Sequence, residues 1–309
     1  MTLDKPIELC FICDDAYLQH MTAAAASAAD HTGRRLNLWL IHPGLSAASF
    51  EKLAQFEKMF SNLTIHLVEG SLKPFEGMPP PEKWPELIYL KLQLPELLPV
   101  DRVLMLDCDI IVLDDLAKIF DLPFPEGIHI AACNDLASQR KLDDRRLKTG
   151  DYFNAGVMMF DLEALRKEHF FPRVLEVPPE VLRKIKCPEQ DLLNWYFGGK
   201  WLRLSSRWNL FSGLSRHRIR KKFRPVKDDL FDVLKSPGIV HYTADKPWKY
   251  ALSRTPYDKY YRCYLKKTPF ADYHYPPFRW RDVLLLILPW RLRKKLGRKF
   301  DAARSRKNH

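Results

Sequence analysis

The sequence predicts an α/β fold with a mixed, mostly parallel β-sheet. Strand-like and helix-like segments alternate in the N-terminal part of the chain, and hydrophobic residues make up 46% of its 309 residues. Such alternation is typical of a parallel sheet with helices on both faces. In addition, two carboxylates follow the most apolar strand-like segment. The length allows one large domain with appendages or two small domains.

The elements of the first part are expected in a regular order. Three segments have the short apolar pattern of strands: 7–13, 36–41 and 63–68. Three segments are expected to be helical: 16–29, 47–60 and 84–97, the last despite Pro85 and Pro95. A loop rich in Pro and Gly is expected at 69–81.

After about residue 128 the pattern is less regular. A strand is expected at 129–133, followed by a polar segment at 135–150 and the apolar segment 152–161. Helices are expected at 162–168 and 190–197, and 238–240 is strand-like. Beyond residue 258 the chain becomes aromatic and basic, and Pro276-Pro277 marks a hinge before a C-terminal tail.

The run at 103–112 carries two carboxylates, Asp107 and Asp109, in an apolar frame. Alternate side chains of a strand point to one face, so the two carboxylates converge if they lie where a buried strand ends. Two adjacent anions in apolar surroundings are unfavourable unless a cation joins them. A divalent ion with oxygen ligands is the natural candidate. The competing interpretation is a capped strand followed by a turn.

A second acidic pair, Asp14-Asp15, follows the first strand. Ligands of such sheets bind beyond the carboxyl ends of the strands, so both acidic pairs are expected at one edge. Asp15 could instead be the N-cap of the next helix.

Three further segments combine polar groups with predicted element ends. Asn154 and Gly156 precede an apolar run, and Gln190-Asp191 lies at a helix start. His241 follows a strand, with Lys246 five residues later. Each has a structural interpretation as a turn, a helix cap or a structurally satisfied histidine. The functional interpretation is that Lys246 meets a phosphate that a histidine-bound metal also contacts.

Taken together, these motifs resemble those of the family 8 glycosyltransferases, which are retaining enzymes that use nucleotide sugars. The similarity covers roughly residues 7–250 and is greatest to the bacterial lipopolysaccharide galactosyl- and glucosyltransferases. It implies a Rossmann-like nucleotide-binding domain of GT-A type over residues 1–260 and a separate tail over 261–309. It also implies transfer of galactose or glucose from a UDP-hexose to a glycan or lipid-linked acceptor such as lipopolysaccharide core.

The resemblance assigns roles to individual residues. It implies that Mn²⁺ (or Mg²⁺) is held by Asp107, Asp109 and His241. It places Gln190 and Asp191 near the reacting carbon. It assigns donor binding to a larger set, in chain order: Asp14, Asp15, Tyr17, Tyr89, Lys91, Asp107, Cys108, Asp135, Asn154, Ala155, Gly156, Glu189 and Lys246. Of these, Lys246 is expected to bind the diphosphate.

The chain departs from the family pattern at three places. Between His241 and Lys246 the spacer is one residue shorter than usual, and Ala244 stands where Gly is expected. Ala16 replaces a common Asn, and Glu189 replaces a frequent Asp. None of these changes removes an expected metal ligand.

The tail carries most of the positive charge. The formal net charge is +12, and residues 279–309 hold eleven Lys/Arg against two Asp. The apolar run 283–290, which ends at Trp290 and is preceded by Trp280, is far shorter than the ~20 residues that span a bilayer, and six basic residues follow it. This composition predicts a helix that docks on an anionic membrane, the alternative being a helix packed on the domain. Nucleic-acid binding is not expected, because no nucleic-acid motif accompanies the charge.

The six cysteines are expected to be reduced, buried thiols, with a redox or zinc pair at Cys10-x-x-Cys13 as the alternative. The N-terminus shows no signal peptide, so a cytoplasmic protein, peripheral on the inner face of the membrane, is expected.

Two other functions fit part of the pattern. A phosphatase of the haloacid dehalogenase type also has Asp-x-Asp after a strand, but it requires this motif near the start of its catalytic domain and a Thr or Val where Ile111 stands. A non-catalytic nucleotide-sugar binder is the second alternative. Isotope transfer from a UDP-sugar separates the three functions.

Overall fold

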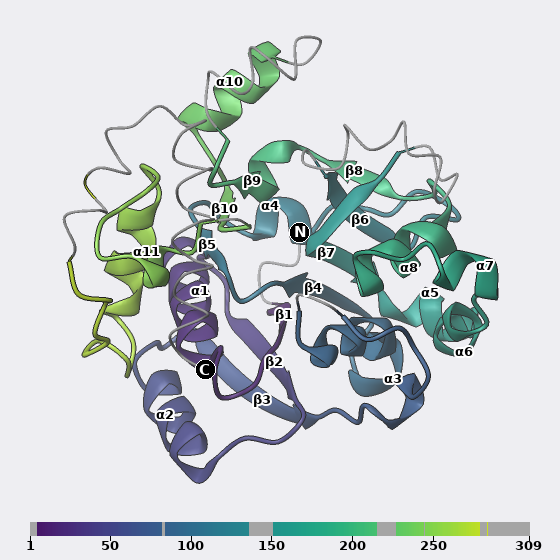
Figure 1. Ribbon diagram of the computed structural model, residues 1–309, viewed down its shortest axis with the longest axis horizontal. Coiled ribbons are helices and arrows are strands. Elements are labelled where there is room, and N and C mark those ends of the chain that lie inside the picture. Colours follow the sequence, from purple (N-terminus) through teal and green to yellow (C-terminus); the bar gives the residue numbers. More distant parts are fainter. Residues whose placement is uncertain are drawn as a thin grey trace.

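The computed structural model describes residues 5–81, 84–135, 151–214, 227–243, 245–278 and 283. Its centre is a seven-stranded sheet with the order β3-β2-β1-β4-β7-β6-β8 (Figure 1). All neighbouring strands in it are parallel except β7, which runs antiparallel to β4 and β6. The predicted mixed, mostly parallel sheet is confirmed. Its strands are β1 (Ile7–Ile12), β2 (Leu36–His42), β3 (Leu63–Glu69), β4 (Arg102–Leu106), β6 (Ile130–Asn134), β7 (Phe153–Asp161) and β8 (Leu202–Leu204).

A second, three-stranded sheet has the order β5-β10-β9. Its strands are β5 (Ile110–Val112), β9 (Leu210–Phe211) and β10 (Ile239–His241). The central strand β10 runs antiparallel to β5 and parallel to β9. Because β5 follows β4 after only three residues, the second sheet is tied directly to the middle of the first.

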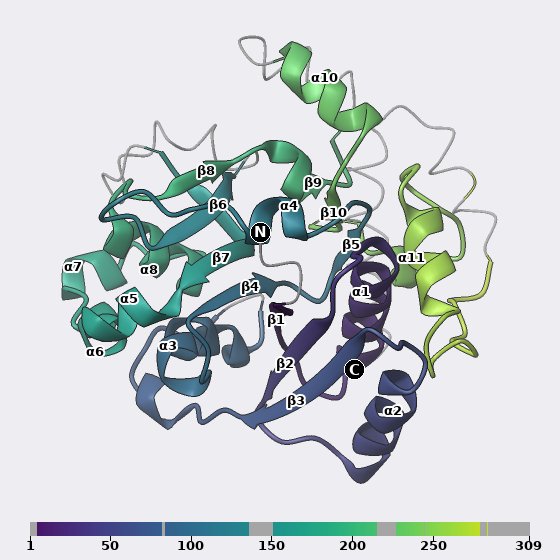
Figure 2. The same cartoon turned by 180° about the vertical axis from the view of Figure 1, so that it is seen from behind.

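Helices cover both faces of the main sheet (Figures 1 and 2). The α-helices are α1 (Leu18–His31), α2 (Ala47–Glu57), α3 (Leu94–Leu97), α4 (Ala117–Phe120), α5 (Leu162–Lys167), α6 (Phe170–Leu175), α7 (Pro179–Leu182), α8 (Pro188–Phe197), α10 (Lys227–Lys235) and α11 (Asp258–Leu265). The 3₁₀ turns are η1 (Lys73–Phe75), η2 (Glu86–Gln93), η3 (Ser206–Asn209) and η5 (Pro247–Lys249).

The alternation of side chains along the strands produces two apolar layers. In β1, Leu9 and Phe11 pack with α1, α2 and the second sheet, whereas Cys10 and Ile12 pack with η2, α3 and α8 on the opposite face. The Ala-rich sequence of α1 is almost entirely buried, because small side chains let this helix lie close to β5 and α11.

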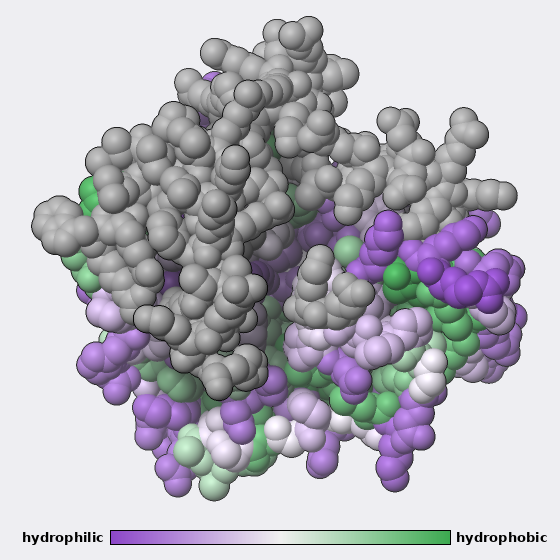
Figure 3. All heavy atoms as spheres, viewed as in Figure 1, coloured by the Kyte–Doolittle hydropathy of each residue, from purple (hydrophilic) through white to green (hydrophobic). Residues whose placement is uncertain are grey.

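Figure 3 shows the outer surface of one face, where hydrophilic side chains gather over α7.

Local sequence signals start and end the helices that bear on the site. Ser46 caps α2 by accepting a hydrogen bond from the Ser49 amide. Helix α8 has Pro188 in its first turn and ends at Gly198, whose φ of 53° is left-handed. Helix α11 packs against α1 and crosses the expected domain boundary at residue 260, which itself stays a prediction.

The buried strand before the two carboxylates ends where the sequence predicted it. β4 ends at Leu106, directly before Asp107, and β5 begins at Ile110 in the other sheet. The helical segment expected at 84–97 is confirmed from 86 to 97, but its first eight residues form the 3₁₀ helix η2 and only the single turn α3 is α-helical. Pro95 lacks the N–H that an α-helix would pair with the Lys91 carbonyl, which favours the tighter turn.

All six cysteines are free thiols, but only four are buried as expected. Cys10, Cys13, Cys108 and Cys133 are buried, whereas Cys187 is half-buried and Cys263 is exposed. None of the helices among the described residues is both long and apolar enough to cross a membrane. The C-terminal run with the basic tail lies outside the described residues except for Val283.

We expect Gly238→Ala to weaken the second sheet. An added Cβ would lie 2.8 Å from Cε3 of the buried Trp208 ring, which is rigid. Overpacking of this kind should lower the free energy of unfolding by about 1–3 kcal/mol. Urea denaturation of the purified protein measures the change.

The control is Gly33→Ala, because an added Cβ there meets nothing within 4 Å. This variant should be as stable as the wild type or slightly more stable. Equal stability of the two alanine variants would contradict the tight packing of Gly238 on Trp208.

Candidate active site

The expected metal ligands lie where the chain passes from one sheet to the other. Asp107 follows β4, and its amide donates to the Gly156 carbonyl of β7 at 2.8 Å. Asp109 precedes β5, and its carbonyl accepts from the Tyr242 amide at 2.9 Å. In the antiparallel pair β5–β10, His241 lies opposite Ile110. Two backbone pairings therefore bring the histidine beside both carboxylates.

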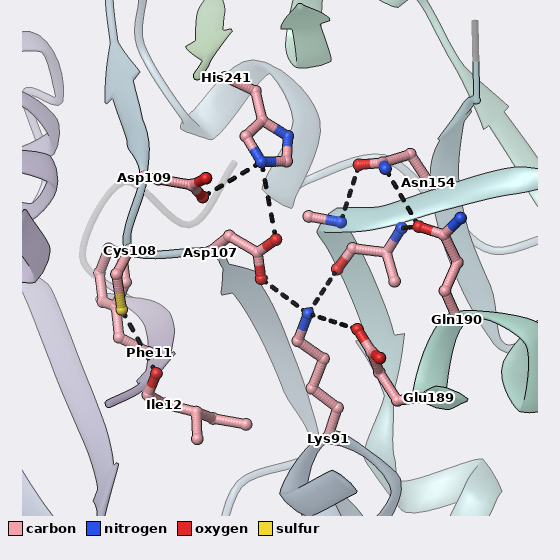
Figure 4. A network of polar contacts seen from close by, with 12 residues as sticks. Phe11, Ile12, Lys91, Asp107, Cys108, Asp109, Asn154, Glu189, Gln190 and His241 are labelled. Atoms are coloured by element: carbon pink, nitrogen blue, oxygen red, sulfur yellow. Dashed lines mark hydrogen bonds and ion pairs between the residues drawn. The ribbon is translucent and has the colours of Figure 1, made fainter. Parts of the chain in front are cut away.

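The three side chains converge as the sequence predicted (Figure 4). His241 Nε2 lies 3.1 Å from Asp109 Oδ1 and 3.7 Å from Asp107 Oδ2. One ligand atom from each residue lies within 4.8 Å of the others, which is the spacing of a site that could hold one ion. Two carboxylates and one imidazole are ligands that suit Mn²⁺.

Two lysines balance the carboxylates. Lys91 Nζ lies 2.7 Å from Asp107 Oδ1 and 3.4 Å from Glu189 Oε1, and it also donates to the Ala155 carbonyl at 3.2 Å. Lys246 forms an ion pair with Asp109. The structure thus places the lysine expected to bind diphosphate directly at a candidate metal ligand.

In this site, burial and the neighbouring charges of opposite sign shift the pKa of Asp109, Lys91 and Glu189 in opposite directions. Burial alone would raise the pKa of Asp109, but the charges of Lys246 and His241 hold that pKa well below its usual range. Burial disfavours the charge of Lys91, yet Asp107 and Glu189 raise its pKa. Burial raises the pKa of Glu189, and the nearby Lys91 offsets this only in part.

A chain of amide hydrogen bonds extends from the histidine to α8. His241 Nδ1 contacts Asn209 Oδ1 at 2.9 Å, and Asn209 Nδ2 donates to Asn154 Oδ1 at 2.8 Å. Asn154 Nδ2 in turn donates to Gln190 Oε1 at 3.0 Å. The Gln190 amide nitrogen donates to Asp135 Oδ2 at 3.0 Å. Predicted residues from four segments are therefore joined in one network.

Gly156 is required next to the histidine. An added Cβ at this position would lie 2.3 Å from His241 Cε1 and 2.9 Å from Asn154 Oδ1. No side chain fits there, so the glycine in the Asn-Ala-Gly segment makes room for the imidazole.

Asp191 lies deeper than its neighbour Gln190. Its side chain is fully buried, with Oδ1 accepting from the Tyr152 hydroxyl at 2.6 Å and Oδ2 accepting from the amides of Lys186 and Cys187. Asp191 thus holds the backbone at the start of α8, as a helix-capping residue does. The expected place of Asp191 near a reacting carbon stays a prediction.

The residues expected to bind the nucleotide lie around the end of β1. Asp14 accepts from the Tyr17 amide at 3.1 Å, whereas the exposed Asp15 accepts from the Ser46 amide at the start of α2. Asp15 is therefore not the N-cap of α1. The Tyr17 ring meets Trp248 edge to face.

Two other expected donor contacts have protein partners. Tyr89 donates its hydroxyl to the Pro79 carbonyl at 2.6 Å and stacks on Phe75. The Cys108 thiol donates to the Ile12 carbonyl at 3.3 Å.

Asn209 is a residue of the site that the sequence reasoning missed. It ends η3, immediately before β9, and is only 2% exposed. His241 was singled out as a polar residue beside a short apolar strand. Asn209 also lies beside an apolar strand, but β9 has only two residues and forms no pattern that the sequence alone would reveal.

Comparison with known proteins gives the class and then the family. The galactosyltransferase LgtC, in complex with donor and acceptor sugar analogues, superposes with a TM-score of 0.74 at 22% identity over 89% of this chain and 99% of that one. The fold is thus that of the GT-A glycosyltransferases. The family model "Glycosyl transferase family 8" matches residues 8–251, and the chain belongs to this family of glycosyltransferases.

Curated relatives agree with this assignment. General stress protein A of Bacillus subtilis is 25% identical over 87% of this chain and 96% of its own length. Lipopolysaccharide 1,2-glucosyltransferase of Escherichia coli K12 is 26% identical over 77% of this chain and 70% of its own. The resemblance noted in the sequence is confirmed at the level of the family.

We expect Lys91→Met to destabilise the protein. Methionine keeps the apolar stem but leaves Asp107 and Glu189 without their shared buried cation. Removing one partner from a buried ion pair should lower the free energy of unfolding by about 3–5 kcal/mol. Thermal and urea denaturation without added metal measure the loss.

Lys167→Met is the matched control, because Lys167 pairs with Glu163 on the exposed surface of α5. Exposed pairs contribute little, so its denaturation midpoint should equal that of the wild type. A wild-type midpoint for Lys91→Met as well would show that the buried lysine does not stabilise the site.

Proposed function

We propose that the protein transfers galactose or glucose from a UDP-sugar to a glycan or lipid-linked acceptor, such as lipopolysaccharide core, with retention of configuration. The observation that carries this proposal is the convergence of Asp107, Asp109 and His241 beside Lys246 in a family 8 chain. The relatives support the sugar and the acceptor class: one is named a lipopolysaccharide 1,2-glucosyltransferase and another a galactosyltransferase.

The residues present fit a divalent cation. Asp107, Asp109 and His241 would hold Mn²⁺ or Mg²⁺, whereas a closed zinc site would favour Cys and His ligands. When bound, such an ion supplies Lewis-acid chemistry that neutralises the negative charge of a departing nucleoside diphosphate. The ion pair between Lys246 and Asp109 supports the same idea, since it shows that this position attracts a cation.

The side chains have separate tasks in the proposed reaction. Lys246 adds a positive charge where the diphosphate leaves, which stabilises the transition state electrostatically. Lys91 holds Asp107 in place from the opposite side. Gln190 holds Asn154 and the Ala155 amide with its oxygen, so the loop that would line the sugar is fixed before the donor binds.

We propose that Glu189 and Asp135 together accept hydrogen bonds from the sugar hydroxyls. Both carboxylates are anchored from within the protein, Glu189 by Lys91 and Asp135 by Gln190. Galactose and glucose differ at one hydroxyl, and carboxylates accept hydrogen bonds from either arrangement. A panel of UDP-sugars tested for Mn²⁺-dependent UDP release identifies the donor.

We expect Asp109→Asn to reduce sugar transfer at least about a hundredfold in kcat/KM, because a neutral amide neither holds the cation nor balances Lys246. Transfer of labelled sugar from the UDP-donor to the acceptor measures the effect. Asp121→Asn is the control, since Asp121 pairs with Arg34 on the surface and should leave transfer unchanged.

Three outcomes separate the candidate functions. Full transfer by Asp109→Asn would contradict the proposed metal site. Tight binding of UDP-sugar by the wild type without transfer or hydrolysis would favour the non-catalytic binder. Release of inorganic phosphate would favour the phosphatase, which membership of family 8 already disfavours.

We also propose that the protein works at the cytoplasmic face of a membrane, held there by its basic tail. The support is compositional: the apolar run 283–290, which ends at a tryptophan, precedes six basic residues, which are Arg291, Arg293, Lys294, Lys295, Arg298 and Lys299. A lipid-linked acceptor would be met at such a surface.

Replacing these six residues by Gln should abolish sedimentation with anionic vesicles, since each is worth about 1 kcal/mol of attraction. Hydrolysis of a soluble donor should continue, and added salt should weaken the binding of the wild type. Undiminished sedimentation of the substituted protein would rule out the tail as the anchor.

A further inference from the structure

The two nitrogens of His241 face different partners. The ring is 4% exposed, and Nε2 points to Asp109 and Asp107 (Figure 4). On the other side of the ring, Nδ1 lies 2.9 Å from Asn209 Oδ1. A neutral imidazole carries one proton on one of these nitrogens, and only the nitrogen without it can ligate a metal.

Backbone amides determine which end of each side-chain amide is oxygen. The Gly156 amide donates to Asn154 at 3.0 Å, and the Ala155 amide donates to Gln190 at 3.0 Å. A backbone N–H can only donate, so the contacted atoms are the amide oxygens of Asn154 and Gln190.

The same reasoning extends to Asn209. Because Asn154 Oδ1 is an acceptor, the Asn209 atom that contacts it at 2.8 Å is the amide nitrogen. The Asn209 oxygen then faces His241, where it requires a hydrogen on Nδ1. The direction of every hydrogen bond from Gly156 to the imidazole is thereby fixed.

We propose that Asn209 is a positioning residue that keeps the proton of His241 on Nδ1 and leaves the Nε2 lone pair for a divalent cation. Without an acceptor at Nδ1, the two carboxylates would draw the proton to Nε2, where it would occupy the ligand position. Ring partners of this kind orient metal-binding histidines and set their tautomer. The link to a metal rests on the proposed function, whereas the tautomer itself does not.

The position of Asn209 is well defined by its surroundings. It follows Trp208, which packs against Gly238, and β9 pairs with β10 directly after it. The amide of Ser212 donates to the His241 carbonyl at 2.9 Å. Asn209 thus lies directly before β9, and His241 ends the adjacent strand β10, so the contact between their side chains does not depend on a free loop.

The tautomer is measured by NMR of the full-length, metal-free protein labelled with ¹⁵N-histidine in mildly alkaline buffer. The chain has ten histidines, and the ring signals that disappear in the variant His241→Gln are those of His241. We expect Nδ1 of His241 to have the shift of a protonated ring nitrogen in the wild type. In Asn209→Ala the proton should move to Nε2. A wild-type Nδ1 without a proton would overturn the proposal, whether or not any variant folds.

Metal binding provides the second measurement. Asn209→Ala should weaken Mn²⁺ binding about ten- to a hundredfold, followed through the EPR signal of free Mn²⁺. Asn209→Asp keeps an acceptor at Nδ1 and should restore both the tautomer and most of the affinity. Asn194→Ala is the control: Asn194 is equally buried, at 1%, but bonds the backbone of Phe153 and Gln190 rather than the histidine.

Circular dichroism shows which variants are folded. If folded Asn209→Ala keeps the wild-type tautomer and Mn²⁺ affinity, Asn209 is only structural and the proposal is wrong. If the tautomer behaves as expected but no UDP-sugar is turned over, the proposed function fails and the assignment of the ring proton stands.

Discussion

The antiparallel pairing of β5 with β10 is the constraint on which the site depends. It places His241 opposite Ile110, one residue from Asp109, although His241 and Asp109 are far apart in the sequence. The pairing of β4 with β7 fixes Asp107 on the other side through the Gly156 carbonyl. Because backbone hydrogen bonds set these positions, side chains need only complete a geometry that the two sheets already define.

Charge balance is the second feature that the site requires. Two neighbouring carboxylates in a largely buried place are unfavourable without positive charges nearby. Here Lys91 pairs with Asp107 and Lys246 pairs with Asp109. Lys91 is buried and bonded to three groups, so it is a fixed part of the structure. Lys246 has Asp109 as its ion-pair partner and is followed by Trp248, which stacks on His20 at 3.7 Å. Burial lowers the pKa of His20 to about 3, so the ring that stacks on Trp248 is uncharged.

The sequence was sufficient to predict most of the main sheet, because α1 and every strand except the three-residue β8 carry local patterns of five or more residues. It also singled out the three candidate metal ligands that the structure brings together: Asp107 follows β4, Asp109 precedes β5 and His241 ends β10. It did not reveal the second sheet, whose strands have two or three residues and are defined only by long-range pairing. Asn209 was missed for the same reason: its role depends on a neighbour that only folding supplies.

The late position of β10 has a consequence for synthesis on the ribosome. The strands β1 to β4 can pair as soon as they emerge, and the Val112 amide can already bond the Ser27 hydroxyl of α1. The apolar strand β5, however, has an unpaired edge until the chain has grown past His241. Unpaired edges invite association between nascent chains. Slow translation between these segments would lengthen that exposure, so the yield of folded protein should depend on the codons that encode them.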